Sequence, residues 1–273
     1  MQREGCRMSG GVQEPAAAGM ITLDDLDNMT DELGSDSAYN SNGSVEEEAE
    51  PMEDGEQDRL LNYWQTVARG HQVEVPNDMA EPIQQMTRNR RTEERQTVPF
   101  LLISCKEKCG ERLYEKRQYG KAKWACIKMK EERYEQSICM GFMKLMRYIC
   151  EQNSLGLYLG MTIPILTTVH MDEARTGITR SVTVAYYIPA HLQDDPPQPT
   201  DPEIVIEEWP TTEVFSRSFL GATNEETIMR EISLLAELLE SPELCLQDSF
   251  IVAGYTNPAA ADRRSEIWFL QGP

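Results

Sequence analysis

Long apolar runs, clustered basic residues and an apolar leader are all missing from this sequence. No stretch of about 18 apolar residues occurs, which predicts that no helix spans a membrane. The N-terminal stretch MQREGCRMSGGVQEP lacks the apolar core that a secretory signal requires. The formal net charge of −20 argues against nucleic-acid binding, because neutralising phosphates takes clustered lysine and arginine. These absences favour a cytoplasmic protein without a nucleic-acid partner.

Histidine is scarce, and the common catalytic motifs are absent. Only three histidines occur in 273 residues, and no two of them are four residues apart. No Gly-x-Ser-x-Gly, phosphate-binding loop or His-Glu-x-x-His sequence is present. Cys105 and Cys109 have no second pair of ligands nearby, so we expect no zinc site. The sequence therefore predicts a protein that is not an enzyme and has neither catalytic nor metal-binding residues.

The seven cysteines are an odd number scattered through a long chain. A disulfide framework normally has an even number of cysteines in a short secreted chain. We therefore expect reduced thiols, which again favours the cytoplasm.

The negative charge is concentrated near the N-terminus. Residues 1–58 contain 16 acidic and two basic residues, whereas residues 101–273 contain 25 acidic and 18 basic ones. A segment with so few large apolar side chains cannot bury enough surface to offset its conformational entropy. We therefore expect residues 1–98 to be a disordered acidic tail and linker, with a short amphipathic helix at 59–68. The folded domain is expected at 99–273.

One part of the tail, ITLDDLDNMTDEL from Ile21 onward, interleaves apolar and acidic residues. Two interpretations remain open for it. It is either a short helix that folds on a protein partner or a solvated linker.

The order of expected elements repeats along the domain. In the first half, residues 111–129 are expected to form two strands with a break near Gly120. An amphipathic helix follows at 131–153. Strands are then expected at 155–171, with an interruption at Pro164, and at 181–192. In the second half, strands at 203–221 precede a helix at 224–244 that Asn224 can cap, and strands follow at 249–255 and 263–271. Each half thus reads strand–strand–helix–strand–strand. The repeat predicts an α+β fold with a barrel-like antiparallel or mixed sheet flanked by two helices. Trp124, Trp209 and Trp268 fall at comparable points of the repeat, and we expect core or barrel-rim positions for them.

Four separated motifs resemble one known family. They are YEKRQYGKAKW, GMTIPI, YYIPAHLQDDPPQPTDPEIVIEE and AGYTNP followed by RRSEIWFL, and they cover roughly residues 111–271. Together they resemble the SOUL family of heme-binding proteins, most closely its SOUL (heme-binding protein 2) branch through RQYGKAKW. The resemblance implies a distorted β-barrel of two related halves, a cytosolic location and reversible binding of heme or another tetrapyrrole. It implies no enzyme activity.

The resemblance also suggests where a ligand lies. Gln118 occupies the position at which the SOUL branch carries a histidine proposed as an iron ligand, so no strong histidine ligand is expected. We predict a mainly apolar site near the first helix. The candidates for ligand contact are Met140, Phe142, Met143, Met146 and Met161. Those for pairing with heme propionates are Lys121, Lys123, Lys144 and Arg147. Phe142 and Met146 also fit the core stripe of that helix, whereas Met140 and Met143 lie off the stripe and are the better candidates for ligand contact. The alternative function is a protein-interaction module that has lost heme binding and acts through its acidic tail or second helix.

Overall fold

The computed structural model describes residues 62, 64–66, 68–69, 72–90, 95–221, 223–239, 248–255 and 264–271. The predicted acidic tail at 1–58 lies outside these residues. No helix of the described part is long and apolar enough to cross a membrane.

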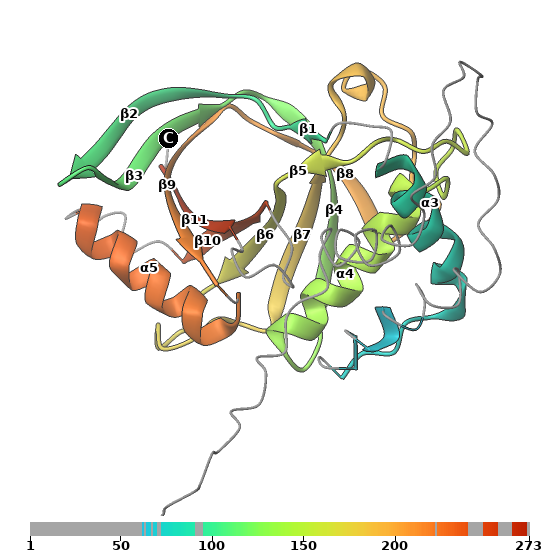
Figure 1. The fold of residues 1–273 in the computed structure, drawn as a ribbon, viewed down its shortest axis with the longest axis horizontal. Helices are drawn as coiled ribbons and strands as arrows, with labels where there is room; N and C mark the ends of the chain where they lie inside the picture. Colours follow the sequence, from blue (N-terminus) through green and yellow to red (C-terminus); the bar gives the residue numbers. More distant parts are fainter. Residues whose placement is uncertain are drawn as a thin grey trace, which may run out of the picture.

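A curled nine-stranded sheet dominates the fold, with strand order β2-β3-β9-β11-β10-β6-β7-β4-β8 (Figure 1). Its strands are β2 (Phe100–Lys108), β3 (Glu111–Tyr119), β4 (Ala122–Lys130), β6 (Ile165–His170), β7 (Ser181–Tyr187), β8 (Ile204–Trp209), β9 (Thr212–Leu220), β10 (Ser249–Gly254) and β11 (Arg264–Leu270). All neighbouring strands in it are antiparallel. A separate parallel pair joins β1 (Gln96–Thr97) to β5 (Thr162–Ile163). The predicted α+β barrel-like fold is confirmed.

The strand order reads as two related halves that meet at the β10–β6 pair. Outward from that pair, β11, β9 and β3 on one side correspond to β7, β4 and β8 on the other. The helices also correspond, because α4 (Tyr134–Ile149) follows β4 and α5 (Glu225–Leu239) follows β9. The predicted repeat is therefore confirmed, with β2 as an additional edge strand. The backbone N–H of Thr227 donates to the side-chain Oδ1 of Asn224 at 2.8 Å, which confirms Asn224 as the cap of α5.

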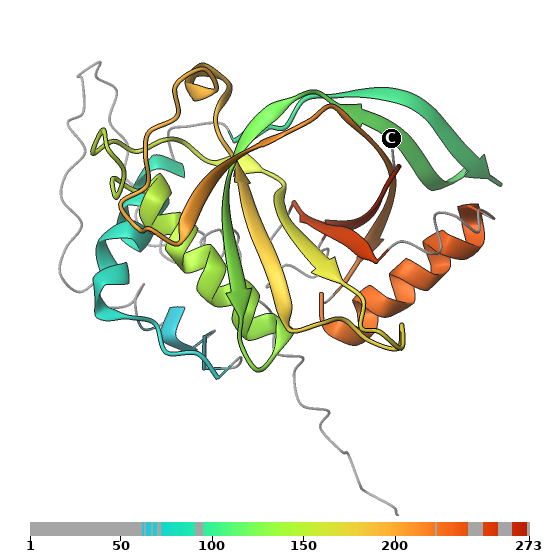
Figure 2. The same cartoon turned by 180° about the vertical axis from the view of Figure 1, so that it is seen from behind.

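The two helices lie outside the curl of the sheet, as the two opposite views show (Figures 1 and 2). A large core cluster joins α4, α5 and the convex face, whereas a smaller cluster fills the concave face. Gly141 lets α4 approach β7 closely, since a Cβ there would lie 2.8 Å from Val184 Cγ2. The side chains on the concave face are therefore free of helix contacts and available to line a site.

Part of the predicted linker contributes to the core. The 3-10 helix η1 (Asn77–Met79) leads into α3 (Ala80–Arg90), and Met79, Ile83 and the more N-terminal Trp64 are almost fully buried in the large cluster. The described residues 62, 64–66 and 68–69 are helical. The amphipathic spacing at 59–68 predicts docking of a helix on the domain, and Trp64 is buried there. Helix α3 was not predicted, because its few apolar residues form a weak pattern and its packing depends on contact with α4.

Candidate ligand-binding cavity

The concave face of the sheet holds a cavity of about 360 Å³. Strands β6, β7, β10 and β11 line it from within, and the connections β3–β4 and β8–β9 lie at its exposed rim. Five of its lining residues are aromatic: Tyr119, Trp124, Tyr187, Trp209 and Trp268. The volume lies within the range of pockets that take small organic ligands.

Two stacked ring pairs form the aromatic walls. Trp124 at the start of β4 stacks on Trp209 at the end of β8, with ring centroids 4.9 Å apart and planes at 23°. Tyr119 on β3 stacks on Trp268 of β11 at 4.6 Å and 25°. Such walls favour a flat, largely apolar ligand, because each ring presents a broad face at little cost in side-chain entropy.

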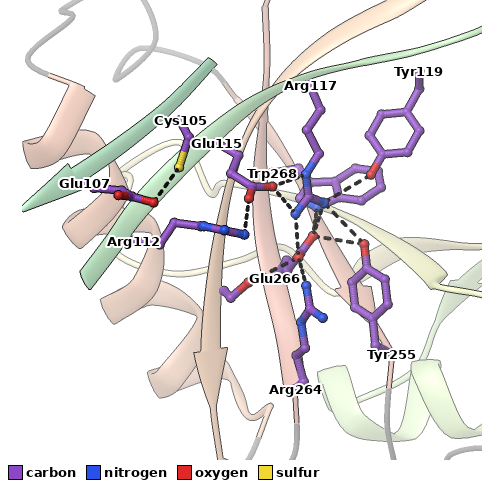
Figure 3. A network of polar contacts seen from close by, with 11 residues as sticks. Cys105, Glu107, Arg112, Glu115, Arg117, Tyr119, Tyr255, Arg264, Glu266 and Trp268 are labelled. Carbon is purple, nitrogen blue, oxygen red and sulfur yellow. Dashed lines mark hydrogen bonds and ion pairs between the residues drawn. The ribbon is translucent and has the colours of Figure 1, made fainter. Parts of the chain in front are cut away.

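A buried polar cluster lies beside the aromatic walls (Figure 3). Arg117 and Glu266, which are 3% and 0% exposed, form a two-pronged ion pair. Nη1 of Arg117 donates to Oε2 of Glu266 at 2.8 Å, and Nη2 donates to Oε1 at 3.0 Å. Side chains two residues apart on a strand share a face, so Tyr119 and Trp268 point to the same side as this pair.

The cluster holds the two aromatic side chains in place. Trp268 donates its ring N–H to Glu266 at 2.8 Å, and Arg117 donates to the Tyr119 hydroxyl at 3.3 Å. Tyr255 also donates to Glu266, at 3.0 Å. Burial raises the pKa of Tyr119 to about 12, although Arg117 works against that rise. The Tyr119 hydroxyl is therefore neutral near pH 7.

Arg117 and Glu266 keep each other ionised through their direct contact. Burial raises the pKa of Glu266, but its hydrogen bonds and the charge of Arg117 lower it by more, so its pKa lies below its ordinary value. Burial likewise lowers the pKa of Arg117, but Glu266 raises it well above its ordinary value. Both groups are thus ionised near neutral pH.

The cavity wall itself offers little that could react. Among the described residues that line it there is no carboxylate, histidine, cysteine or methionine. Its one cationic lining residue is Lys121, whose exposed ammonium pairs with Glu208 on the surface at 2.7 Å. Across the described residues, no group of three or more His, Cys, Asp or Glu is placed to hold a metal ion. The arrangement suits binding of an apolar ring whose acidic edge reaches the rim.

Gln118 does not line this cavity. It alternates with Arg117 and Tyr119 on β3, so its side chain belongs to the opposite face of the strand. Its strand neighbours are Leu101 and Glu213.

The four residues predicted for ligand contact on the first helix lie together on α4, but outside the concave cavity. Phe142, Met143 and Met146 are almost completely buried in the large core cluster, and Met140 packs partly buried against it. Helical periodicity identified Phe142 and Met146 as core residues correctly. It missed the burial of Met143, which the predicted stripe left outside the core.

The two predicted cationic residues of α4 already have acidic partners. Lys144 forms ion pairs with Glu203 and with Asp201, the latter at 3.7 Å. Arg147 pairs with Asp78, which precedes α3, at 2.6 Å. Both cations are half-buried, and neither belongs to the cavity lining.

Met161 borders a different hollow, which His191 and Tyr158 also line. Among the residues that line the concave cavity, sequence reasoning named only Lys121, as a partner for propionates. The available signal was the recurrence of aromatic residues at equivalent points of the two halves, which had been assigned to core or rim packing.

The fold and site together define a curled-sheet binding protein with an aromatic cavity. Residues 95–270 match the SOUL family, described as SOUL heme-binding protein. The chain belongs to the SOUL heme-binding protein family.

Curated relatives agree with this assignment. Heme-binding protein 2 of Mus musculus is 32% identical over 161 residues, which are 58% of this chain and 78% of the relative. Heme-binding protein 1 of Sus scrofa is 28% identical over 177 residues, which are 64% of this chain and 93% of the relative.

Among solved structures, the chain is similar to the EcmrR C-terminal domain, with a TM-score of 0.43 and 11% identity over 58% of this chain and 96% of that one. It is also similar to a hydrolase from Listeria innocua, with a TM-score of 0.40 and 10% identity over 59% and 93% of the two chains. Likeness at this level implies no shared function.

Proposed function

We propose that this chain binds heme or a related tetrapyrrole reversibly, without catalysis, in the concave cavity. The observation that carries the proposal is that the residues matching the SOUL heme-binding family enclose an apolar cavity walled by stacked aromatic rings. A tetrapyrrole is a flat apolar ring, and such rings gain most from aromatic faces and exclusion of water.

The residues around the cavity fit the macrocycle better than they fit its iron. No histidine, cysteine or methionine is present in the described lining, and the Tyr119 hydroxyl is neutral and engaged by Arg117. An uncharged phenol is a poor iron ligand, since the ligating form is the phenolate. We therefore propose binding without a strong axial ligand. The propionates of a bound tetrapyrrole would find a cation in Lys121 at the rim.

A site on α4, which the sequence predicted, is less well supported. Phe142, Met143 and Met146 are packed into the core, so a ligand would have to displace their protein contacts. Arg147 and Lys144 would have to exchange carboxylate partners that they already have. A ligand in the concave cavity would displace no core packing, and only the exposed pair of Lys121 with Glu208 would have to open.

We also infer a cytoplasmic location. The five described cysteines are all free thiols, and two of them, Cys105 and Cys109, are exposed. Exposed free thiols persist in a reducing compartment.

Titration of the full chain with hemin tests the function. Three of the four tryptophans line the cavity, so a ligand bound there should quench most of the tryptophan emission. We expect a saturable shift of the Soret band and quenching that share one midpoint. A chain that shows no saturable Soret shift at micromolar protein would contradict heme binding, and a Soret shift without quenching would contradict the cavity as its site.

A further inference from the structure

The edge strand β2 is exposed along its whole length. All nine of its residues are exposed, and it pairs with β3 on one side only. Phe100, Leu101, Leu102 and Ile103 follow one another and are 42%, 63%, 49% and 43% exposed. A long, apolar edge of this kind readily accepts another strand, because its outer N–H and C=O groups have no ladder partner.

The two ends of β2 differ in the features that prevent another strand from pairing with them. The C-terminal half carries Lys106, Glu107 and Lys108, and its register with β3 breaks between Lys106 and Glu107. Another break lies nearer the start of the strand, between Leu102 and Ser104. Charges and bulges are common means of preventing strand addition. The first break falls at Ile103, so Phe100, Leu101 and Leu102 are the apolar residues that keep regular pairing with β3.

The opposite edge of the sheet shows how this fold protects a strand. In β8 only Val205 and Glu208 are exposed, and the rest of the strand is buried or half-buried. Glu207 and Glu208 place carboxylates on that edge, and Pro210 follows it. Phe100, Leu101 and Leu102 of β2 have neither a charge nor a register break among them.

The order of apolar and charged residues along β2 indicates what kind of strand would pair with its free edge. Along the strand, apolar residues come first and the cations Lys106 and Lys108 follow, neither of which forms an ion pair with another described residue. A complementary strand running parallel to β2 carries apolar residues first and carboxylates next. The four apolar side chains expose on the order of 400 Å², about half of what each partner buries in a stable protein–protein interface. This area suits a single added strand better than a second folded subunit.

Residues 21–27 of this chain, ITLDDLD, have this pattern. Ile21 and Leu23 alternate as apolar residues on one side of an extended chain, and Asp25 and Asp27 follow on the same side. The segment lies outside the described residues. The intervening residues 28–61 can extend on the order of 100 Å, so the tether permits contact with β2. A tethered segment also has an effective concentration near the millimolar range, so weak pairing suffices.

We propose that the apolar edge of β2 binds residues 21–27 of the same chain as an added parallel strand. The apolar side chains of the segment cover the regular edge at Leu101 and Leu102, and its carboxylates meet Lys106 and Lys108 beyond the break at Ile103. The contact closes the exposed edge and anchors the acidic N-terminal part of the chain to the domain.

Hydrogen–deuterium exchange of the β2 amides in the full chain tests the proposal. The double variant I21K/L23K removes the apolar contacts without touching the folded domain. We expect its β2 amides to exchange about tenfold faster than in the unmodified chain, because the added hydrogen bonds are lost. The matched control V45K/M52K places two lysines elsewhere in the same acidic region, and we expect it to leave exchange unchanged.

A charge exchange tests the register. D25K/D27K should speed β2 exchange, and combining it with K106D/K108D should restore the slow rate. Equal exchange in I21K/L23K, the control and the unmodified chain would overturn the proposal. Protection that rises with protein concentration, together with a doubled mass in light scattering, would identify a second copy as the occupant and would overturn it as well.

Discussion

Arg117 and Glu266 form a two-pronged ion pair that spans an intervening strand. Arg117 lies on β3 and Glu266 on β11, and β9 separates these strands in the sheet. Glu115 also contacts Arg117, at 2.7 Å through Nε, and Ser218 donates to Glu266 at 3.1 Å. Because almost every polar atom of the pair has a partner, the cluster can hold ionised groups away from water. It thereby holds Tyr119 and Trp268, which form one wall of the cavity.

Replacing Glu266 by glutamine should strongly destabilise the fold. The change leaves the Arg117 charge buried with fewer compensating contacts, and breaking a buried pair typically costs about 3–5 kcal/mol. Urea unfolding measures the loss. Glu208→Gln is the matched control, because it breaks the exposed pair with Lys121 and should cost less than about 1 kcal/mol. Similar losses in the two variants would contradict the assigned role of the cluster.

Acid should remove the contribution of Glu266. Its pKa in the folded chain lies below the ordinary value of 4.5, so the stabilisation is complete above that pH and declines as the pH falls below it. We expect the stability difference between the unmodified chain and Glu266→Gln to be constant from pH 7 to about 5 and to shrink toward pH 3. A difference that stays constant or grows on acidification would show that the Glu266 carboxylate is not stabilised as described.

The fold was more predictable than the site, for physical reasons. Strands and helices of the repeat have clear periodicities, and Gly120, Pro164 and Pro210 mark their breaks. Strand β2 was missed because FLLISCKEK alternates too little, which accords with its exposure on both faces. The chain breaks at Gly120 without the left-handed backbone that favours glycine, whereas Gly110, between β2 and β3, has that backbone, with φ at +83°.

The cavity depends on which face of each strand points inward. Gln118 and Tyr119 are neighbours in the sequence, yet they lie on opposite faces of β3. The curl that brings β3 and β11 side chains together comes from pairings distant in sequence, which local patterns do not encode. Helical spacing favoured a core position for Met146 and ligand contact for Met140 and Met143, yet Met143 is buried as well, because flexible methionines fill core gaps as readily as they contact ligands.

Gly141 and Gly120 should respond differently to alanine. A Cβ at Gly141 would lie 2.8 Å from Val184 Cγ2 and 3.0 Å from Met129 Cγ, whereas nothing lies within 4 Å of a Cβ at Gly120. We expect Gly141→Ala to lower the free energy of unfolding by about 1–3 kcal/mol, because it separates α4 from the sheet. Gly120→Ala should be nearly neutral. Thermal unfolding of both variants checks this, and an unaffected Gly141→Ala would contradict the close approach of α4 to β7.

Introducing histidine at Gln118 should not create an iron ligand. Because this side chain belongs to the face opposite Arg117 and Tyr119, an imidazole there points away from the cavity. We expect hemin to give the same absorption and electron paramagnetic resonance spectra with Gln118→His as with the unmodified chain. A change to a low-spin spectrum would show that residue 118 faces the ligand.

The cationic residues of α4 should be dispensable for ligand binding. Arg147→Ala and Lys144→Ala remove ion pairs with Asp78 and with Asp201 and Glu203, and none of these residues lines the cavity. We expect hemin dissociation constants within about twofold of the unmodified value. A tenfold weakening in either variant would favour a site on the outer face of α4.

Filling the cavity tests the central claim most directly. Thr168 is half-buried and lines the cavity, and its cross-strand neighbour Thr183 is half-buried but does not line it. Hemin titration should show at least about tenfold weaker binding for Thr168→Phe, since the added ring occupies the ligand volume. Thr183→Phe should bind hemin as the unmodified chain does. Undiminished binding by a folded Thr168→Phe variant would contradict the concave cavity as the tetrapyrrole site.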